Sequence, residues 1–289
     1  MDPPSVASFT GLIHGPRLKD RFATNFVTTD VFYQDAEKGN LPTYSFIEPN
    51  LWHNHNDMHP PISMLVPGLA FDAPSALLGG EAFLARIYDA IRSSSSFGGS
   101  NWFNTLLMVV FDEHGGTYDH VPLPTANPPD PAGPAGQMGF TFNRLGVRLP
   151  AIAISPWISE RSVVNDVHHH TSVIRTMRER WELGKPFTGR DATAPDLALL
   201  LTRDKPREPG DWPDVSPQPV PDFDGSLIPL DAPLSPMARW LVGGSVELAR
   251  GLDRSVPEIP NLDDLTGAEG LAIVHETVGH LFPGLRRAG

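Results

Sequence analysis

The stretch Leu106-Leu-Met-Val-Val-Phe-Asp-Glu-His-Gly-Gly116 changes character abruptly at its middle. Its apolar part, residues 106–111, is short and rich in Val and Leu, which is typical of a strand buried on both faces of a parallel sheet. Asp112, Glu113 and His114 follow at once. In open α/β sheets ligands bind beyond the carboxyl ends of the strands, so these groups are placed to hold a hard cation. A strand that merely meets solvent is the other interpretation of the two carboxylates.

An upstream loop carries imidazoles and a further carboxylate. It follows a strand-like run, Tyr44 to Ile47, and is stiffened at its end by Pro60-Pro61. Its polar members are His53, His55, Asn56, Asp57 and His59. Such a loop suits anion binding, proton transfer or metal ligation. A polar surface loop without a function is the alternative.

The bulk composition narrows the class of protein. A net charge of −12 argues against a nucleic-acid partner and against electrostatic adsorption to anionic lipid. The chain of 289 residues is long enough for a sizeable core, and its lack of cysteine excludes disulfides. We expect no transmembrane segment, because no apolar stretch approaches the roughly 20 residues of a span. Residues 1–30 carry no signal-peptide pattern, so the cytoplasm is the default compartment.

The 31 prolines mark the organisation of the chain. Residues 122–134, directly after His120, are too rich in proline for a helix or a central strand, and predict a long loop that is either a lid over the substrate or disordered. We expect a core over residues 1–204, a proline-rich linker over 205–234 and a helical tail over 235–289. In the tail, an apolar face at helical spacing predicts packing on the core; its residues are Leu271, Val274, Val278 and Leu281.

Two further elements are expected within the core. Residues 151–154 predict a second short buried strand. Thr171 or Ser172 can cap a helix that runs to about Leu183. Its inward positions are Val173, Ile174, Met177 and Trp181, and its outward positions are Arg175, Arg178 and Arg180.

Several of these segments, taken in order, resemble one family. They are Tyr44-Ser-Phe-Ile-Glu-Pro49, Asn56-Asp-Met-His-Pro-Pro61 and Phe111-Asp-Glu-His-Gly-Gly-Thr-Tyr-Asp-His-Val121, followed by the blocks at 144–157, 170–172 and 190–191. The chain is similar over about residues 30–205 to the phosphoesterase family of bacterial phospholipases C and acid phosphatases. The resemblance implies an α/β fold like that of alkaline phosphatase, a mostly parallel sheet flanked by helices.

The resemblance also implies a chemistry and a set of residues. Members hydrolyse phosphoesters with a divalent metal and a Ser or Thr nucleophile, through a covalent phospho-enzyme. Asp112 and Glu113 match the metal-binding carboxylates, and their oxygen ligands favour Ca²⁺, Mg²⁺ or Mn²⁺. The catalytic positions would be Asp57, His59, His114 and His170, with His120 and Asn56 beside them. A phosphoester or phospholipid head group is the expected substrate.

The chain also departs from the family's pattern. The Glu-Asn-Arg-Ser-Phe-Asp-like segment that opens the family's domain, and the nucleophilic Ser or Thr, are not found before the Ile47-Glu-Pro49 segment. We therefore expect a catalytic domain incomplete at its amino-terminal side and weakly active or inactive. A non-catalytic homologue that binds phosphate or a head group is the rival, and a complementing half on a separate chain is a third possibility. Because relatives are often exported, the compartment stays open.

Overall fold

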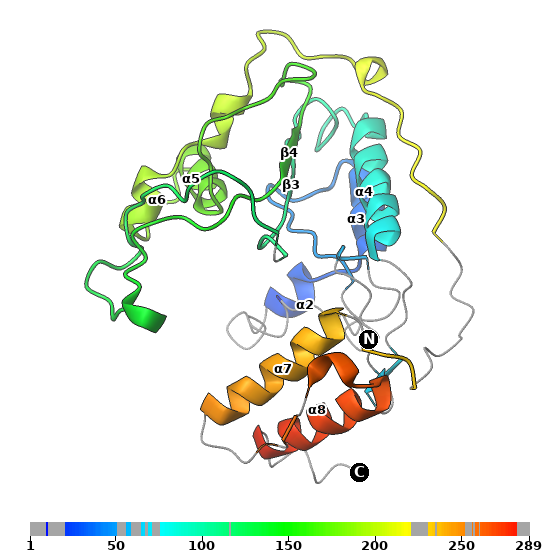
Figure 1. Ribbon diagram of the computed structural model, residues 1–289. Coiled ribbons are helices and arrows are strands. Elements are labelled where there is room, and N and C mark those ends of the chain that lie inside the picture. The colour runs from blue at the N-terminus through cyan, green and yellow to red at the C-terminus, as the bar shows by residue number, and fades with distance from the viewer. Residues whose placement is uncertain are drawn as a thin grey trace. The chain divides into compact units, whose positions relative to one another are not determined.

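The computed structural model describes residue 10 and residues 21–50, 56–58, 65–66, 69–70, 76–115, 117–220, 231–234, 236–251, 256, 258–259 and 261–281. The chain divides into two compact units (Figure 1). The first comprises Met1–Gln34, Pro42–Asp89 and Val215–Gly289, and the second comprises Asp35–Leu41 and Ala90–Asp214.

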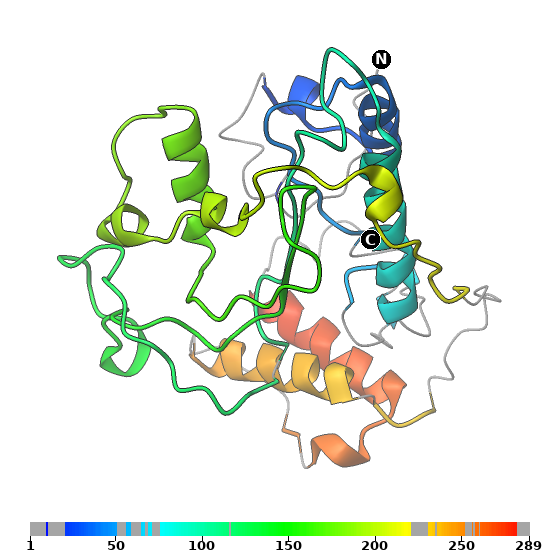
Figure 2. The ribbon, with the colours of Figure 1, turned by 90° about the horizontal axis from the view of Figure 1, so that it is seen from above.

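A pair of long helices contains the core of the first unit. Helices α7 (Pro236–Gly251) and α8 (Gly267–Leu281) lie side by side in both views (Figures 1 and 2). The tail thus forms two helices, as its apolar spacing predicts. Ala238 and Val242 of α7 are completely buried, and Leu234 and Leu265 from the flanking segments are mostly buried beside them. Val274 of α8 is half-buried against this cluster, whereas the side chains of Leu271, Val278 and Leu281 lie outside the described residues.

The first unit also holds short elements and most of two helices that continue into the second. Its short elements are α2 (Phe22–Asn25) and an antiparallel hairpin of β1 (Leu65–Val66) and β2 (Leu69–Ala70). Helices α3 (Thr29–Lys38) and α4 (Ala76–Ser93) contact each other. There the Arg86 guanidinium lies 3.9 Å above the Tyr33 ring and 3.5 Å from the Asp30 carboxylate.

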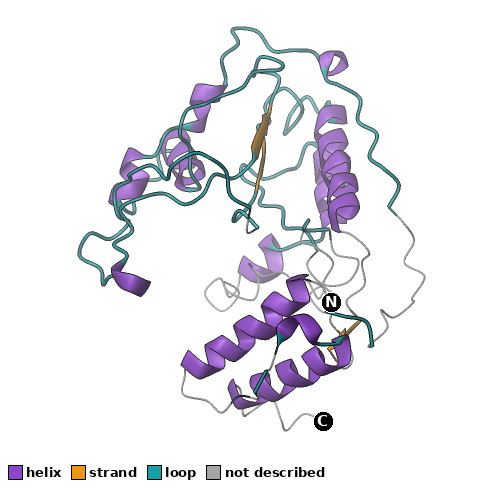
Figure 3. Cartoon of the chain, in the orientation of Figure 1, coloured by secondary structure: helices purple, strands orange, loops and turns teal. Residues whose placement is uncertain are grey.

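The second unit is built around two strands that pair in the opposite sense to the one predicted. Strand β3 (Leu107–Val110) pairs antiparallel with β4 (Ala151–Ile154), with Leu107 opposite Ile154. The expected parallel sheet is therefore wrong for these strands. A parallel pair needs a crossover, usually a helix, but the described residues of the proline-rich connection contain only the 3₁₀ turn η2 (Gln137–Gly139). Figure 3 shows this connection as loop almost throughout.

The strands are also less buried than predicted. Val110 is 47% exposed and Ile152 is 55% exposed, and no residue of either strand is fully buried. The apolar run correctly predicts a strand. It does not predict which segments pack on the faces of that strand, because those segments come from distant parts of the chain. The mixture of helices and a small sheet agrees with the α/β class. The upstream run Tyr44 to Ile47 forms no strand.

The remaining helices of the second unit are α5 (Thr171–Arg180), α6 (Gly189–Thr193), η3 (Leu197–Leu200) and η4 (Pro209–Asp211). Helix α5 ends at Arg180, before the predicted Leu183, and Trp181 is exposed rather than inward. Arg178 is buried rather than outward, because α6 packs against α5 and supplies Asp191, whose carboxylate is 3.4 Å from the Arg178 Nε. Periodicity alone assigns an arginine to solvent and does not reveal a partner thirteen residues away.

No helix in the described part of the chain combines the length and the hydropathy that crossing a bilayer requires.

Candidate functional site

The turn after β3 holds the carboxylates that the sequence singles out. The Asp112 Oδ1 accepts the Glu113 N–H at 3.0 Å, and the Glu113 Oε2 accepts the Gly115 N–H at 2.8 Å. Both side chains are exposed, and Gly115 has a φ of +60°, where glycine is favoured. Each carboxylate thus uses one oxygen to stabilise its own turn. This local role is the plainer of the two interpretations given to the pair.

His170 reaches the end of the same strand from a distant part of the sequence. It is the N-cap residue of α5, and its Nε2 lies 2.9 Å from the carbonyl oxygen of Phe111, the residue before Asp112. A carbonyl can only accept, so the Nε2 carries the proton of this hydrogen bond. In the neutral imidazole the Nδ1 is then unprotonated and available as a base. The structure therefore brings His170 to the turn that carries Asp112 and Glu113.

The two histidines before His170 have separate surroundings. The His169 Nδ1 is 2.6 Å from the Thr171 hydroxyl, and its pKa is lowered, first by burial and then by the charges of Arg190, His168 and His170. His169 is consequently neutral at pH 7. The His168 Nδ1 lies 3.1 Å from the Asp166 carbonyl, while its Nε2 is buried without a hydrogen-bond partner among the described residues.

His114 and His120 lie on either side of Tyr118. The His114 ring packs on Tyr118 with centroids 4.9 Å apart, and its Nδ1 is buried without a hydrogen bond in the described part of the chain. His120 is exposed. Its neighbour Asp119 pairs with Arg148 at 2.6 Å, and the Val121 N–H, followed by Arg148, lowers the pKa of that carboxyl. This ion pair closes the base of the proline-rich loop.

The upstream loop belongs to the first unit. The Asn50 N–H donates to the Asn56 Oδ1 at 2.6 Å, and the Asn56 N–H donates to the Asn50 carbonyl at 2.9 Å, so Asn56 closes the loop. A Cβ at Gly80 of α4 would lie 2.5 Å from the Met58 Cγ, so the glycine allows this segment to pack on the helix. Asp57 is half-buried beside it. His59, like His53 and His55, lies outside the described residues.

The donors that a divalent metal would need are not complete. Among the described residues, no group of three or more His, Cys, Asp or Glu side chains is arranged to hold an ion. Asp112 and Glu113 suit a hard cation chemically, but Mg²⁺ takes about six oxygen ligands and Ca²⁺ six to eight. These residues by themselves therefore do not fit a complete metal site.

Two arginines organise the site region, Arg148 and Arg190; both lie in the family blocks, but the sequence alone does not reveal their contacts. The Arg190 Nε donates to the Asn127 carbonyl at 2.9 Å, and its Nη2 donates to the Phe142 carbonyl at 2.5 Å. With the Arg148–Asp119 pair, this contact holds the long loop to α6. The sequence does carry a signal for such contacts: a proline-rich loop leaves carbonyls without ladder partners, and these can accept from side-chain donors. Spacing does not say which arginine supplies them.

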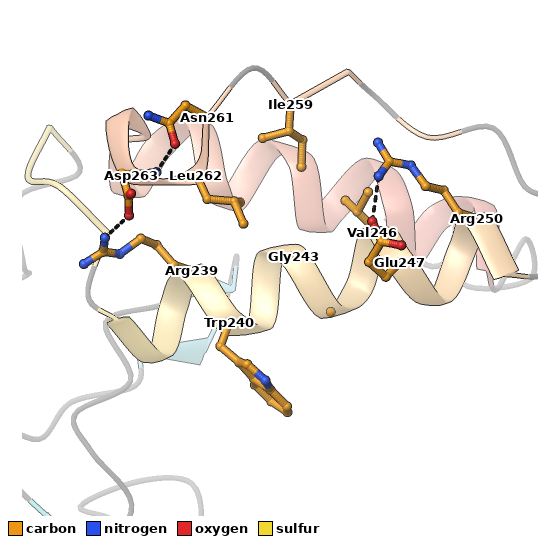
Figure 4. A pocket seen from close by; sticks show the side chains of 11 residues that line it. Arg239, Trp240, Gly243, Val246, Glu247, Arg250, Ile259, Asn261, Leu262 and Asp263 are labelled. Atoms are coloured by element: carbon orange, nitrogen blue, oxygen red, sulfur yellow. Dashed lines mark hydrogen bonds and ion pairs between the residues drawn. The ribbon is translucent and has the colours of Figure 1, made fainter. Parts of the chain in front are cut away.

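A groove of about 840 Å³ lies between α7 and the 3₁₀ turn η5 (Leu262–Asp264) (Figure 4). Figure 4 shows Arg239 paired with Asp263, and Arg250 paired with Glu247, on this side of α7, while Trp240 points away. No residue predicted for the site lines the groove. The charged side chains that line the groove are paired with one another, so it offers no unpaired charge to a ligand.

Comparison with known proteins gives a consistent result. Residues 14–184 match the model of the Phosphoesterase family. Non-specific phospholipase C5 of Arabidopsis thaliana is 33% identical over 73% of this chain and 39% of its own length, and non-specific phospholipase C4 of the same plant is 31% identical over 83% and 43%. Phospholipase C B of Mycobacterium tuberculosis is 30% identical over 53% and 32%. The chain thus spans less than half the length of these relatives.

Proposed function

Because this chain belongs to the phosphoesterase family, we propose that it acts on phosphoester bonds, with phospholipid head groups as its substrate class. The observation that carries the proposal is the meeting of His170 with the Asp112–Glu113 turn at the carboxyl end of β3. The names of the relatives, which are phospholipases C, support the substrate class.

The histidines of the second unit supply the proton chemistry in this proposal. With its Nε2 held by the Phe111 carbonyl, His170 keeps one ring nitrogen free of that bond to accept or donate a proton at a phosphate oxygen or a leaving group. His114, whose ring packs on Tyr118, is assigned to orient an anionic oxygen in the same turn. Asp57 and His59 face the phosphate in the motif that they match, and we assign them the same part here.

Asp112 and Glu113 are the proposed ligands of a divalent cation, Ca²⁺, Mg²⁺ or Mn²⁺, which would polarise a phosphoryl oxygen. The described residues do not complete the coordination of such an ion. Two carboxylates with water bind such an ion weakly, and we therefore propose a low turnover for this chain alone.

The incomplete set of donors favours one rival function, a non-catalytic protein that binds a phosphate or a phospholipid head group. Such a protein would keep the imidazoles of His114 and His170 at the anion and would not need the carboxylates.

Hydrolysis of p-nitrophenyl phosphate and of p-nitrophenylphosphorylcholine, with and without added divalent ions, tests the proposal. Asp112→Asn keeps the oxygen that accepts the Glu113 N–H and removes the charge, so activity should fall at least about 100-fold while the melting temperature is unchanged. Asp130→Asn is the matched control, because the Asp130 Oδ1 likewise accepts a local N–H, from Ala132. Absence of turnover, with phosphate still raising the melting temperature of both variants, would instead establish the binding protein.

A further inference from the structure

Two neighbouring loops of the second unit expose large apolar side chains. In the first loop, residues 136–142, Met138 is fully exposed and Phe140 and Phe142 are each about two-fifths exposed. In the second, residues 181–187, Leu183 is 63% and Phe187 is 80% exposed. We call these five residues the apolar loop patch. Groups of exposed apolar side chains mark interaction sites more often than single ones do.

Contacts around α6 join the two loops. The second loop runs directly into α6, where the Phe187 N–H donates to the Asp191 carboxylate at 2.9 Å. The first loop is held to the same helix by Arg190, which donates to the Phe142 carbonyl. Upstream of this loop, the Asn127 amide donates to the Thr193 hydroxyl of the helix at 3.2 Å. Both parts of the patch are therefore anchored to one short helix.

The first loop holds its apolar side chains in a fixed conformation. The Gly136 N–H donates to the Phe140 carbonyl at 2.7 Å, and the rings of Phe140 and Phe142 pack edge to face with centroids 5.0 Å apart. Met138 and Phe142 have φ values of 55° and 57°, in the left-handed region that favours glycine. Such a conformation is unfavourable for large side chains and commonly occurs at functional positions. The strain is hard to explain if the loop only connects two strands.

The composition of the patch favours a lipid surface over a protein partner. Met138 is fully exposed and the patch comes from only two short loops, whereas a standard protein interface buries roughly 800 Å² per partner. Aromatic side chains with a nearby Lys are typical of membrane–water interfaces, and Lys185 lies between Leu183 and Phe187 in the second loop. The net charge of −12 opposes binding to anionic membranes, so the surface should be zwitterionic.

We propose that the apolar loop patch inserts into the surface of zwitterionic phospholipid bilayers and so docks the second unit on its substrate. This inference rests on the proposed function for its substrate class, but binding to the surface requires no turnover. The first loop is part of the longer proline-rich loop, whose base is closed by the Asp119–Arg148 pair, next to His120. Insertion of the loop would thus bring the turn after β3 towards the head groups.

Flotation of the full chain with phosphatidylcholine vesicles tests the proposal. Met138→Asn and Phe142→Asn are suitable variants, because asparagine tolerates the left-handed conformation and removes the apolar side chain without new strain. Each should weaken vesicle binding about tenfold, and the double variant more, with little change in melting temperature. Phe97→Asn is the matched control: Phe97 is as exposed as Met138 but lies outside both loops, and its replacement should leave binding unchanged.

Four results would overturn the proposal. The first two are a failure of the wild-type chain to float with the vesicles, and variants that bind the vesicles as well as the wild type does. The third is binding that requires anionic lipid and is lost in 1 M salt. The fourth is a homodimer of the wild-type chain that Met138→Asn dissociates. The last would make the patch a contact between two copies. Hydrolysis of the water-soluble p-nitrophenyl substrates needs no membrane surface. A lack of hydrolysis would therefore contradict the proposed function, whereas the vesicle experiment tests membrane binding separately.

Discussion

The helix pair α7–α8 and the strand pair β3–β4 both come from apolar sequence, yet they bury it to different extents. Ala238 and Val242 of α7 are completely buried, whereas Val110 of β3 and Ile152 of β4 are about half exposed. A helix pair can close a core from its own neighbours along the chain. A two-stranded sheet has two faces, and other segments of the chain must pack on them before the sheet is stable. Apolar sequence therefore indicates the element, while burial depends on what packs against it.

The largest effect should come from placing a charge in each region. Val242→Asp should lower the free energy of unfolding by roughly 3–5 kcal/mol, because it leaves an uncompensated charge in the core. Ile152→Asp should cost at most about 1 kcal/mol, the scale of strand propensity, since water already reaches this position. Urea unfolding followed by circular dichroism compares the two. Equal costs would mean that β4 is covered in solution, and the contrast between the regions would be lost.

Replacement of two helical glycines should sharpen the comparison at a smaller scale. Gly80→Ala introduces a methyl group 2.5 Å from the Met58 Cγ and 3.1 Å from the Asn56 carbonyl, and overpacking of this kind costs about 1–3 kcal/mol. Gly244→Ala in α7 meets nothing within 4 Å and should stabilise by about 0.5–1 kcal/mol through helix propensity. Thermal unfolding should move in opposite directions for the two variants. A rise for both would show that the loop bearing Asp57 does not pack on α4.

The smallest effect concerns pH and separates the two units. Burial lowers the pKa of His169, so the folded second unit favours the neutral imidazole. The contribution of His169 to the stability of this unit is therefore fully present above the ordinary pKa of 6.5, and it is lost as the pH falls below that value. In the first unit, the Thr266 N–H and hydroxyl lower the pKa of Glu269, and stability is lost only as the pH falls below the ordinary value of 4.5.

Hydrogen exchange of α5 and α8 at pH 7.5 and 5.5, corrected for intrinsic rates, should therefore show a loss of protection in α5 alone. His169→Gln should remove that loss. An equal loss in α8 would contradict the assignment of the pH dependence to His169.

The sequence predicts those parts of the fold that depend on local pattern. The helices of the tail and the two strands lie where their apolar spacing places them. The pairing of β3 with β4 depends instead on the path of the forty residues between them, which apolar periodicity does not describe. Burial of Arg178 has the same kind of cause, because its partner Asp191 lies on another helix.

The site follows the same division. Asp112, Glu113 and His114 can be singled out from one segment, because polar groups at the end of an apolar run are visible in the sequence. His170 hydrogen-bonds to Phe111 across 59 residues, and only the order of family motifs suggested that the two belong together. The catalytic and metal-binding parts assigned to these residues stay predictions.

The contact of Arg190 with the Asn127 and Phe142 carbonyls closes a loop in a chain that has no cysteine. This contact restricts the loop in the manner of a cross-link. Unlike a disulfide, it is not broken by reducing agents, and it persists only while α6 is folded. Cleavage between residues 127 and 142 by a protease would accordingly report the opening of α6, and the loop would keep its order in reducing and oxidising compartments alike.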